Sequence, residues 1–132
     1  VCEIEERLLD RLGGLAPEGR ARVFDDQYIC SGGQLYELAA GHDRFNGDIR
    51  PALIRAAHLP GYPPGLTAHP YDLCTELIAR EAGVVVTDLH GRPLSDPLSE
   101  DAPVSWLGYA NRTLQAKLEP ILQGLFREYG LI

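Results

Sequence analysis

The sequence predicts an α/β protein in which helices and a sheet form a layered sandwich. Three observations favour this class: apolar residues recur at helical spacing near both ends of the chain, a run of three valines follows a predicted helix, and predicted helices alternate with predicted strands. Alternation of this kind is typical of layered α/β domains. A length of 132 residues suits a single domain, 1–132, with its own core.

Two helices and two strands are predicted in the first part of the chain. The first helix has apolar residues at helical spacing and a glycine pair at its end: Ile4, Leu8, Leu9, Leu12, Gly13 and Gly14. A short strand is expected around residues 23–24. A second helix begins near Ser31, whose hydroxyl can cap it, and ends at Gly41. Phe45 then marks another strand.

A segment rich in proline and glycine, residues 51–68, interrupts this alternation. Ala52 to Ala57 can form a helical turn, and the remainder is predicted to be a loop. A loop this long inside a compact domain is usually functional or disordered. We therefore interpret most of 51–68 as a long loop of this kind.

The second part of the chain returns to alternating elements. A third helix is expected from about Asp72 to Ala82, with three apolar residues on one face: Leu73, Leu77 and Ile78. Gly83 ends it, and the valines of 84–86 predict a strand buried on both faces. Residues 104–111 predict a further strand. Pro120 lies inside a final amphipathic helix, which it must kink or restart.

Charge and cysteine content exclude several classes of partner. The formal net charge is −7 and no basic stripe exists, which argues against nucleic acid and against an anionic membrane surface as partners. The three cysteines, Cys2, Cys30 and Cys74, are widely spaced and form no zinc or disulfide pattern. Free thiols, with no apolar run long enough to span a membrane and no signal peptide, predict a cytoplasmic protein.

Two local patterns can carry chemistry, and each also has a structural interpretation. Asp72 opens a predicted helix, where a carboxylate can cap free N–H groups or serve as one ligand of Mg²⁺. Ser31 and Gly32 open another helix, where backbone N–H groups can hold a phosphate or simply receive a cap. His69 lies close to Asp72 in sequence and can contact a phosphate or lie at the rim. Asp88, which ends a buried strand, favours a role in a turn.

The order of motifs resembles the C-terminal half of the inositol monophosphatase family, Mg²⁺-dependent sugar-phosphate phosphatases related in fold to fructose-1,6-bisphosphatase. The matching stretches are "CSGGQLYELAAGHDRFNGDI", "HPYDLCTELIAREAGVVVTDLHGRPL" and "VSWLGYAN". The family pattern has G-S/T-A before a helix, then W-D or Y-D, E-A-G-G-v-v-t-D and a late a-N. The likeness covers roughly residues 20–115.

This resemblance implies roles for particular residues. Asp72 takes the place of the family's C-terminal metal-ligand aspartate. Ser31 and Gly32 match the substrate-contacting backbone, while Asp48, or Gly47 in another alignment, falls near the acid that contacts substrate hydroxyls. His69 is also placed on the substrate side, not from the resemblance but because it lies just before Asp72, where it can contact a phosphate. In this family two or three Mg²⁺ ions activate water and neutralise the phosphate charge.

The chain also departs from the family pattern. The segment from Asp72 to Gly83 is one residue short, Val84 replaces the second glycine of E-A-G-G, and 51–68 is an insertion. The family's G-E-E and D-P-I/L-D-G-T motifs, which hold most of the metal, do not occur in this sequence. The resemblance therefore implies a missing N-terminal half, no catalytic residue in this chain, and no activity of the chain alone.

The resulting hypothesis is the C-terminal domain of a Mg²⁺-dependent phosphatase that hydrolyses a small polyol or sugar phosphomonoester such as an inositol phosphate. Two alternatives stay open: a non-catalytic binding module on the same scaffold, and a bisphosphatase acting on a fructose or nucleotide bisphosphate. Strand edges and apolar surface left by a missing half predict self-association, for which a homodimer is one form.

Overall fold

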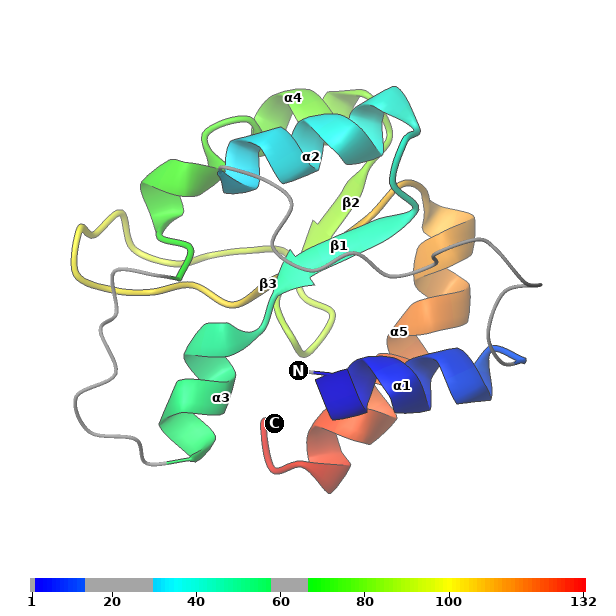
Figure 1. The fold of residues 1–132 in the computed structure, drawn as a ribbon. Helices are drawn as coiled ribbons and strands as arrows, with labels where there is room; N and C mark the ends of the chain where they lie inside the picture. Colours follow the sequence, from blue (N-terminus) through cyan, green and yellow to red (C-terminus); the bar gives the residue numbers. More distant parts are fainter. Residues whose placement is uncertain (1, 14–29, 58–66) are drawn as a thin grey trace.

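A three-stranded antiparallel sheet lies at the centre of the protein (Figure 1). The computed structural model describes residues 2–13, 30–57 and 67–132. Within these ranges the strands are β1 (Phe45–Asp48), β2 (Val85–Thr87) and β3 (Trp106–Tyr109), in the spatial order β1-β3-β2. Together with five α-helices in the same ranges, this open sheet confirms the predicted α/β class.

The central strand β3 separates two apolar clusters because its side chains alternate between the two faces. Phe45 pairs with Tyr109, and Asp48 pairs with Trp106, so each pair shares one face of the sheet. Trp106 belongs to one cluster of buried residues, and Leu107 belongs to the other. The side chains of β3 are thus buried on both sides, as expected for the middle strand of a layered domain.

Helices α2 (Ser31–Ala40) and α4 (Glu76–Glu81) cover the Trp106 face (Figure 1). The buried residues on this side are Leu35, Leu38, Ala68, Leu73, Ala79, Val84, Val86, Val104 and Trp106. Gly41, at φ +78°, ends α2 in the left-handed conformation, as the sequence predicts.

Helices α5 (Arg112–Glu128) and α1 (Cys2–Arg11) cover the opposite face, with α1 packed along α5 (Figure 1). This cluster contains Ile4, Leu8, Ala52, Leu89, Leu107, Tyr109, Leu118, Leu122, Leu125 and Phe126. The short helix α3 (Arg50–Ala56) contributes Ala52 to it. The structure places Pro120 inside α5, and the helix does not restart there.

The helix predicted from Asp72 to Ala82 is wrong in its extent and its buried face. A 3₁₀ helix, η2 (Pro70–Leu73), comes first, and α4 begins only at Glu76. Leu77 and Ile78 are 58% and 71% exposed, because the break between the two helices changes the phase of the periodicity. Within α4 the small Ala79 is the residue buried against the sheet.

Two other expectations are corrected or lie outside the described residues. The predicted inserted loop, 51–68, is helical over its first part, where α3 runs to Ala56 and confirms the expected helical turn. Residues 58–66 and the strand expected around 23–24 lie outside the described ranges. The three valines of 84–86 do lead into a strand, β2, but it is one of the two outer strands of the described sheet.

Candidate functional site

The turn that carries Asp72 is built by its own local sequence. Pro70 stands at the first position of η2, where its fixed φ suits a helix and its missing N–H is not needed. Two residues later, Asp72 Oδ2 accepts a hydrogen bond from the backbone N–H of His69 at 2.9 Å. The His69 ring is buried and stacks on Tyr71, with 5.3 Å between ring centroids. These contacts confirm a capping role for Asp72.

The capping contact leaves part of the Asp72 carboxylate available. Its side chain is 32% exposed, and Oδ1 accepts no hydrogen bond from the described part of the chain. An exposed carboxylate oxygen is a suitable ligand for a hard cation such as Mg²⁺. The capping and metal-ligand interpretations are therefore compatible, because they use different oxygens.

The N-terminus of α2 lies against the same turn. The Thr75 hydroxyl donates to the carbonyl oxygen of Gly32 at 3.1 Å. A Cβ added at Gly32 would lie 3.5 Å from the backbone oxygen of Asp72, so the two segments are in close contact. The structure thus places Gly32, at the start of α2, next to the Asp72 turn, and a shared site for Ser31, Gly32 and Asp72 stays a prediction.

The residue that caps α2 is Cys30, which corrects the prediction that Ser31 does so. Ser31 is the first residue of the helix, while Cys30 has extended backbone angles and its Sγ accepts from the N–H of Gly33 at 3.4 Å. The physical reason is positional: a cap must precede the first helical residue, with its side chain turned back toward the third N–H. Ser31 begins the helix one residue too late for this.

Asp48 lies at the end of β1 and is only 4% exposed. Its carboxylate accepts hydrogen bonds from Arg50 and from the backbone N–H of Ala68, the residue just before His69. Asp48 is thereby joined to the Asp72 turn through the backbone of 68–69. The substrate contact that the sequence predicts for Asp48 remains a prediction.

Asp72 fits the implied Mg²⁺ as one ligand, and it does not stand in a complete ligand set. No three side chains of the types His, Cys, Asp or Glu gather into a potential metal site in residues 2–13, 30–57 and 67–132. Mg²⁺ usually keeps several waters and takes one or two protein carboxylates together with substrate phosphate oxygens. A site centred on Asp72 therefore needs further ligands from outside the described residues.

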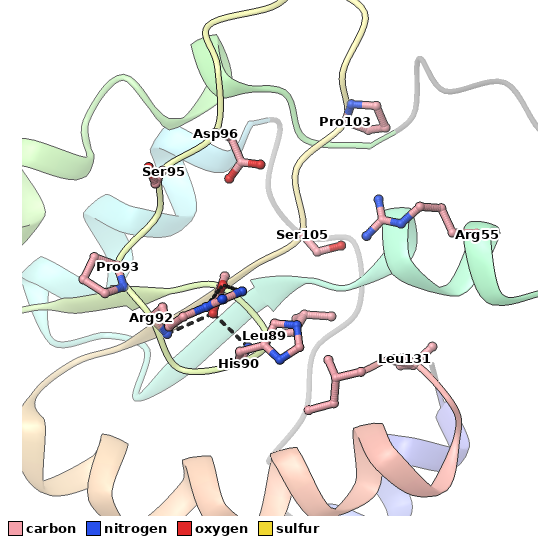
Figure 2. Close-up of a pocket in the computed structure, with 12 residues that line it drawn as sticks. Arg55, Leu89, His90, Arg92, Pro93, Ser95, Asp96, Pro103, Ser105 and Leu131 are labelled. Carbon is pink, nitrogen blue, oxygen red and sulfur yellow. Dashed lines mark hydrogen bonds and ion pairs between the residues drawn. The ribbon is translucent and has the colours of Figure 1, made fainter.

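An open pocket of about 380 Å³, which the sequence did not reveal, lies beside the turn that follows β2 (Figure 2). Asp88 shapes this turn by accepting from the N–H groups of His90 and Arg92 and from the Arg92 side chain, which confirms its predicted turn role. The lining residues are Arg55, Asp88, Leu89, His90, Arg92, Pro93, Ser95, Asp96, Pro103, Ser105, Leu131 and Ile132. They come from separate segments, so no local motif could indicate the pocket.

The charges around this pocket are balanced. Arg92 is paired with Asp88, with 2.9 Å between Nη2 and Oδ2. Figure 2 shows Arg55 on a helix and Asp96 on a loop at another side of the pocket, with Leu89 and Leu131 also among the lining residues. With two arginines and two aspartates in its lining, the pocket has no strong preference for a charged ligand.

Comparison of the chain with models of protein families, with curated proteins and with solved structures finds no match in any of the three. None of the described helices combines the length and the apolar character required to cross a bilayer.

Proposed function

We propose that this chain is the C-terminal domain of a Mg²⁺-dependent phosphatase that hydrolyses a small phosphomonoester of a polyol or sugar, similar to inositol monophosphatase. In this proposal the fold is the C-terminal half of the sugar-phosphatase sandwich. The chain supplies one metal ligand, Asp72, and the substrate-side wall formed by Ser31, Gly32 and His69. The remaining metal ligands and the residues that position the water come from an N-terminal half.

One observation carries most of the support. The Asp72 side chain is partly exposed and has one oxygen without a hydrogen bond from the described residues, and the N-terminal backbone of α2 lies directly against its turn. These two segments are 43 residues apart in sequence at the Thr75–Gly32 contact. They are also the two segments whose motifs resemble the metal and substrate regions of that phosphatase family.

The chemistry assigned to this chain is limited to binding and charge. When bound, Mg²⁺ supplies Lewis-acid activation and neutralises charge on the phosphate. Asp72 would hold the cation through its carboxylate. The backbone at Ser31 and Gly32 forms the side of the site toward the substrate, and the buried His69 ring, stacked on Tyr71, supports the turn beside it. In a protein with a net charge of −7, such a cation would offset the repulsion of an anionic phosphate ester.

The proposal is tested by Asp72→Asn in a protein that contains both halves. We expect Mg²⁺-dependent release of phosphate from inositol phosphate to fall by at least about 100-fold, because a charged ligand is lost. Asp101→Asn is the control, since it neutralises an exposed aspartate in another loop. Near-parental turnover in D72N contradicts the assignment of Asp72 as a metal ligand.

The coding DNA upstream of Val1 separates the enzyme from the alternative of a non-catalytic module. A reading frame that contains a glutamate pair followed by D-P-x-D-G-T supports the phosphatase. A start codon next to Val1 without such a frame supports the module, and the enzymatic proposal is then withdrawn. The bisphosphatase alternative is supported instead if the protein that contains both halves hydrolyses fructose or nucleotide bisphosphates.

A further inference from the structure

We infer that Asp48 is a positioning residue that holds the Asp72 turn in place and does not contact substrate. This inference rests on the proposed role of Asp72 as a metal ligand. Asp48 ends β1, whereas Asp72 belongs to η2, so the two carboxylates come from separate elements. The backbone of Ala68 and His69 connects them.

The carboxylate of Asp48 is fully engaged by hydrogen bonds within the chain. Oδ1 accepts from the backbone N and from Nε of Arg50, both at 2.9 Å. Oδ2 accepts from Nη2 of Arg50 and from the backbone N of Ala68, also at 2.9 Å. A carboxylate has about four acceptor positions, so these donors leave none for a substrate hydroxyl. Burial of the side chain to 4% exposure further limits access.

The hydrogen bond from Ala68 fixes the backbone immediately before the Asp72 turn. The carbonyl oxygen of Ala68 accepts from the N–H of Val104 at 2.7 Å, so this peptide segment is held from two directions. The next residue, His69, donates its N–H to Asp72 Oδ2. The orientation of the Asp72 carboxylate therefore depends on a backbone segment that Asp48 anchors.

The negative charge of Asp48 is what this anchor requires. Hydrogen bonds from a backbone N–H and a guanidinium to an ionised carboxylate are stronger than neutral ones. An asparagine has the same shape, but it has one acceptor oxygen and an NH₂ group that only donates. Its oxygen can accept at most two of the four hydrogen bonds that the carboxylate accepts, and its NH₂ group faces the other two donors, so Asp48→Asn weakens the hold on Arg50 and Ala68.

The test uses the protein that contains both halves, labelled with ¹⁵N, because a site at Asp72 needs further ligands, and Mn²⁺ alone serves as a paramagnetic probe. In the parent chain, Mn²⁺ bound at Asp72 broadens the amide signals of residues 71–75. In D48N we expect the same broadening to require roughly tenfold more Mn²⁺, the low end of the effect of outer partners of a metal ligand. The matched control is Asp88→Asn, which alters another hydrogen-bonded aspartate in a different turn and leaves the Mn²⁺ titration as in the parent.

Hydrogen exchange of the His69 amide provides a second measurement that needs no metal. Because this N–H bonds to Asp72, its exchange is expected to accelerate at least about tenfold in D48N and to stay at the parental rate in D88N. A parental Mn²⁺ titration in D48N, or an unchanged His69 exchange rate, overturns the inference. If D48N does not fold, Arg50→Gln replaces it. The Mn²⁺ concentration needed for the same broadening is then expected to rise by only about threefold.

The two measurements separate this inference from the proposed function. Failure of Mn²⁺ to broaden residues 71–75 in the parent, or broadening that persists in D72N, contradicts a metal ligand at Asp72. In that case the His69 exchange rate alone decides whether Asp48 positions the turn. Broadening that D72N abolishes but D48N leaves unchanged supports the metal site and rejects the positioning role.

Discussion

At the scale of single residues, three aspartates illustrate how a carboxylate can organise backbone N–H groups. Asp72 and Asp88 each accept from N–H groups within four residues, so their roles follow from local sequence. Asp48 accepts from Ala68, which is 20 residues away, in addition to its neighbour Arg50. The first two roles could be predicted from turn and cap chemistry, whereas the contact with Ala68 could not.

Tyr109 is a buried phenol whose ionisation opposes folding. Burial raises the pKa of its hydroxyl above the ordinary value of 10.0, with a smaller contribution from the charge of Glu119. The nearby Thr87 hydroxyl acts in the opposite direction, although neither hydroxyl has a hydrogen-bond partner of ordinary geometry in the described chain. Because burial disfavours the ionised phenol in the folded state, the stability that neutral Tyr109 contributes is fully present below pH 10. This contribution is lost as the pH rises further.

Tyr109→Phe tests this ionisation. We expect the free energy of unfolding near pH 7 to change by no more than about 1 kcal/mol, since the hydroxyl makes no well-formed hydrogen bond. Above pH 10 the variant loses less stability than the parent. Urea unfolding between pH 8 and pH 11 measures the difference, with Tyr36→Phe, at an exposed tyrosine, as the control. Parallel losses in Y109F and the parent contradict the expected contribution.

At the scale of elements, close approach between strands depends on particular glycines. Gly47 of β1 pairs with Leu107 of β3. A Cβ at Gly47 would lie 2.5 Å from the carbonyl oxygen of Trp106 and 3.1 Å from the Cα of Leu107. Both atoms belong to the backbone, so no side-chain rotation can relieve the clash. The β1–β3 pairing therefore requires glycine at this position.

Gly47→Ala is expected to destabilise the chain by about 2 kcal/mol or more, because the strands must separate to admit the methyl group. Gly124→Ala in α5 is the matched control, since an added Cβ there meets its nearest atom only at 3.5 Å. Alanine also favours helix, so G124A should be neutral or stabilise by up to about 1 kcal/mol. Denaturant unfolding of both variants checks the contrast, and equal stabilities contradict the strand-clash argument.

At the scale of the whole molecule, α1 joins the domain through α5. Ile4 and Leu8 are buried in the cluster that includes Leu125 and Phe126. Around this apolar contact, Arg7 and Arg11 form ion pairs with Glu128 at 2.8 Å and 2.6 Å. The hydrogen bond from Arg11, followed by the charges of both arginines, lowers the pKa of Glu128 below 4.5. The stability that these two ion pairs contribute is present above pH 4.5. It is lost as the pH falls through the lowered pKa of Glu128 in the folded state.

Glu128→Gln should therefore reduce the loss of stability between pH 6 and pH 3. The effect should be small because all three side chains are exposed to solvent, which screens their charges. The measurement is the denaturant midpoint at several pH values, compared with Glu100→Gln, which changes an exposed glutamate in a loop. An acid loss in E128Q as large as that in the parent argues against this contribution.

Local signals predicted much of the element content correctly. The apolar spacing of Ile4 and Leu8, the strand at Phe45 and the glycine that ends α2 all appear in the structure. Errors arose where periodicity was followed across a break, as at Leu77 and Ile78. They also arose where two neighbouring residues could both act as a cap, as with Cys30 and Ser31.

For the candidate site, the sequence alone determined the α/β class and placed Asp72 at the start of a helical segment, because periodicity, caps and turns depend on residues a few positions apart. Only the tertiary structure decided that β3 lies between β1 and β2, that Gly32 contacts the Asp72 turn, and that the Asp48 carboxylate holds the N–H of Ala68. Strand order and the partners of buried polar groups depend on segments that are far apart in the sequence. These segments meet only when the apolar clusters pack in the folded chain. Such contacts are set by packing across the molecule and leave no local pattern in the chain.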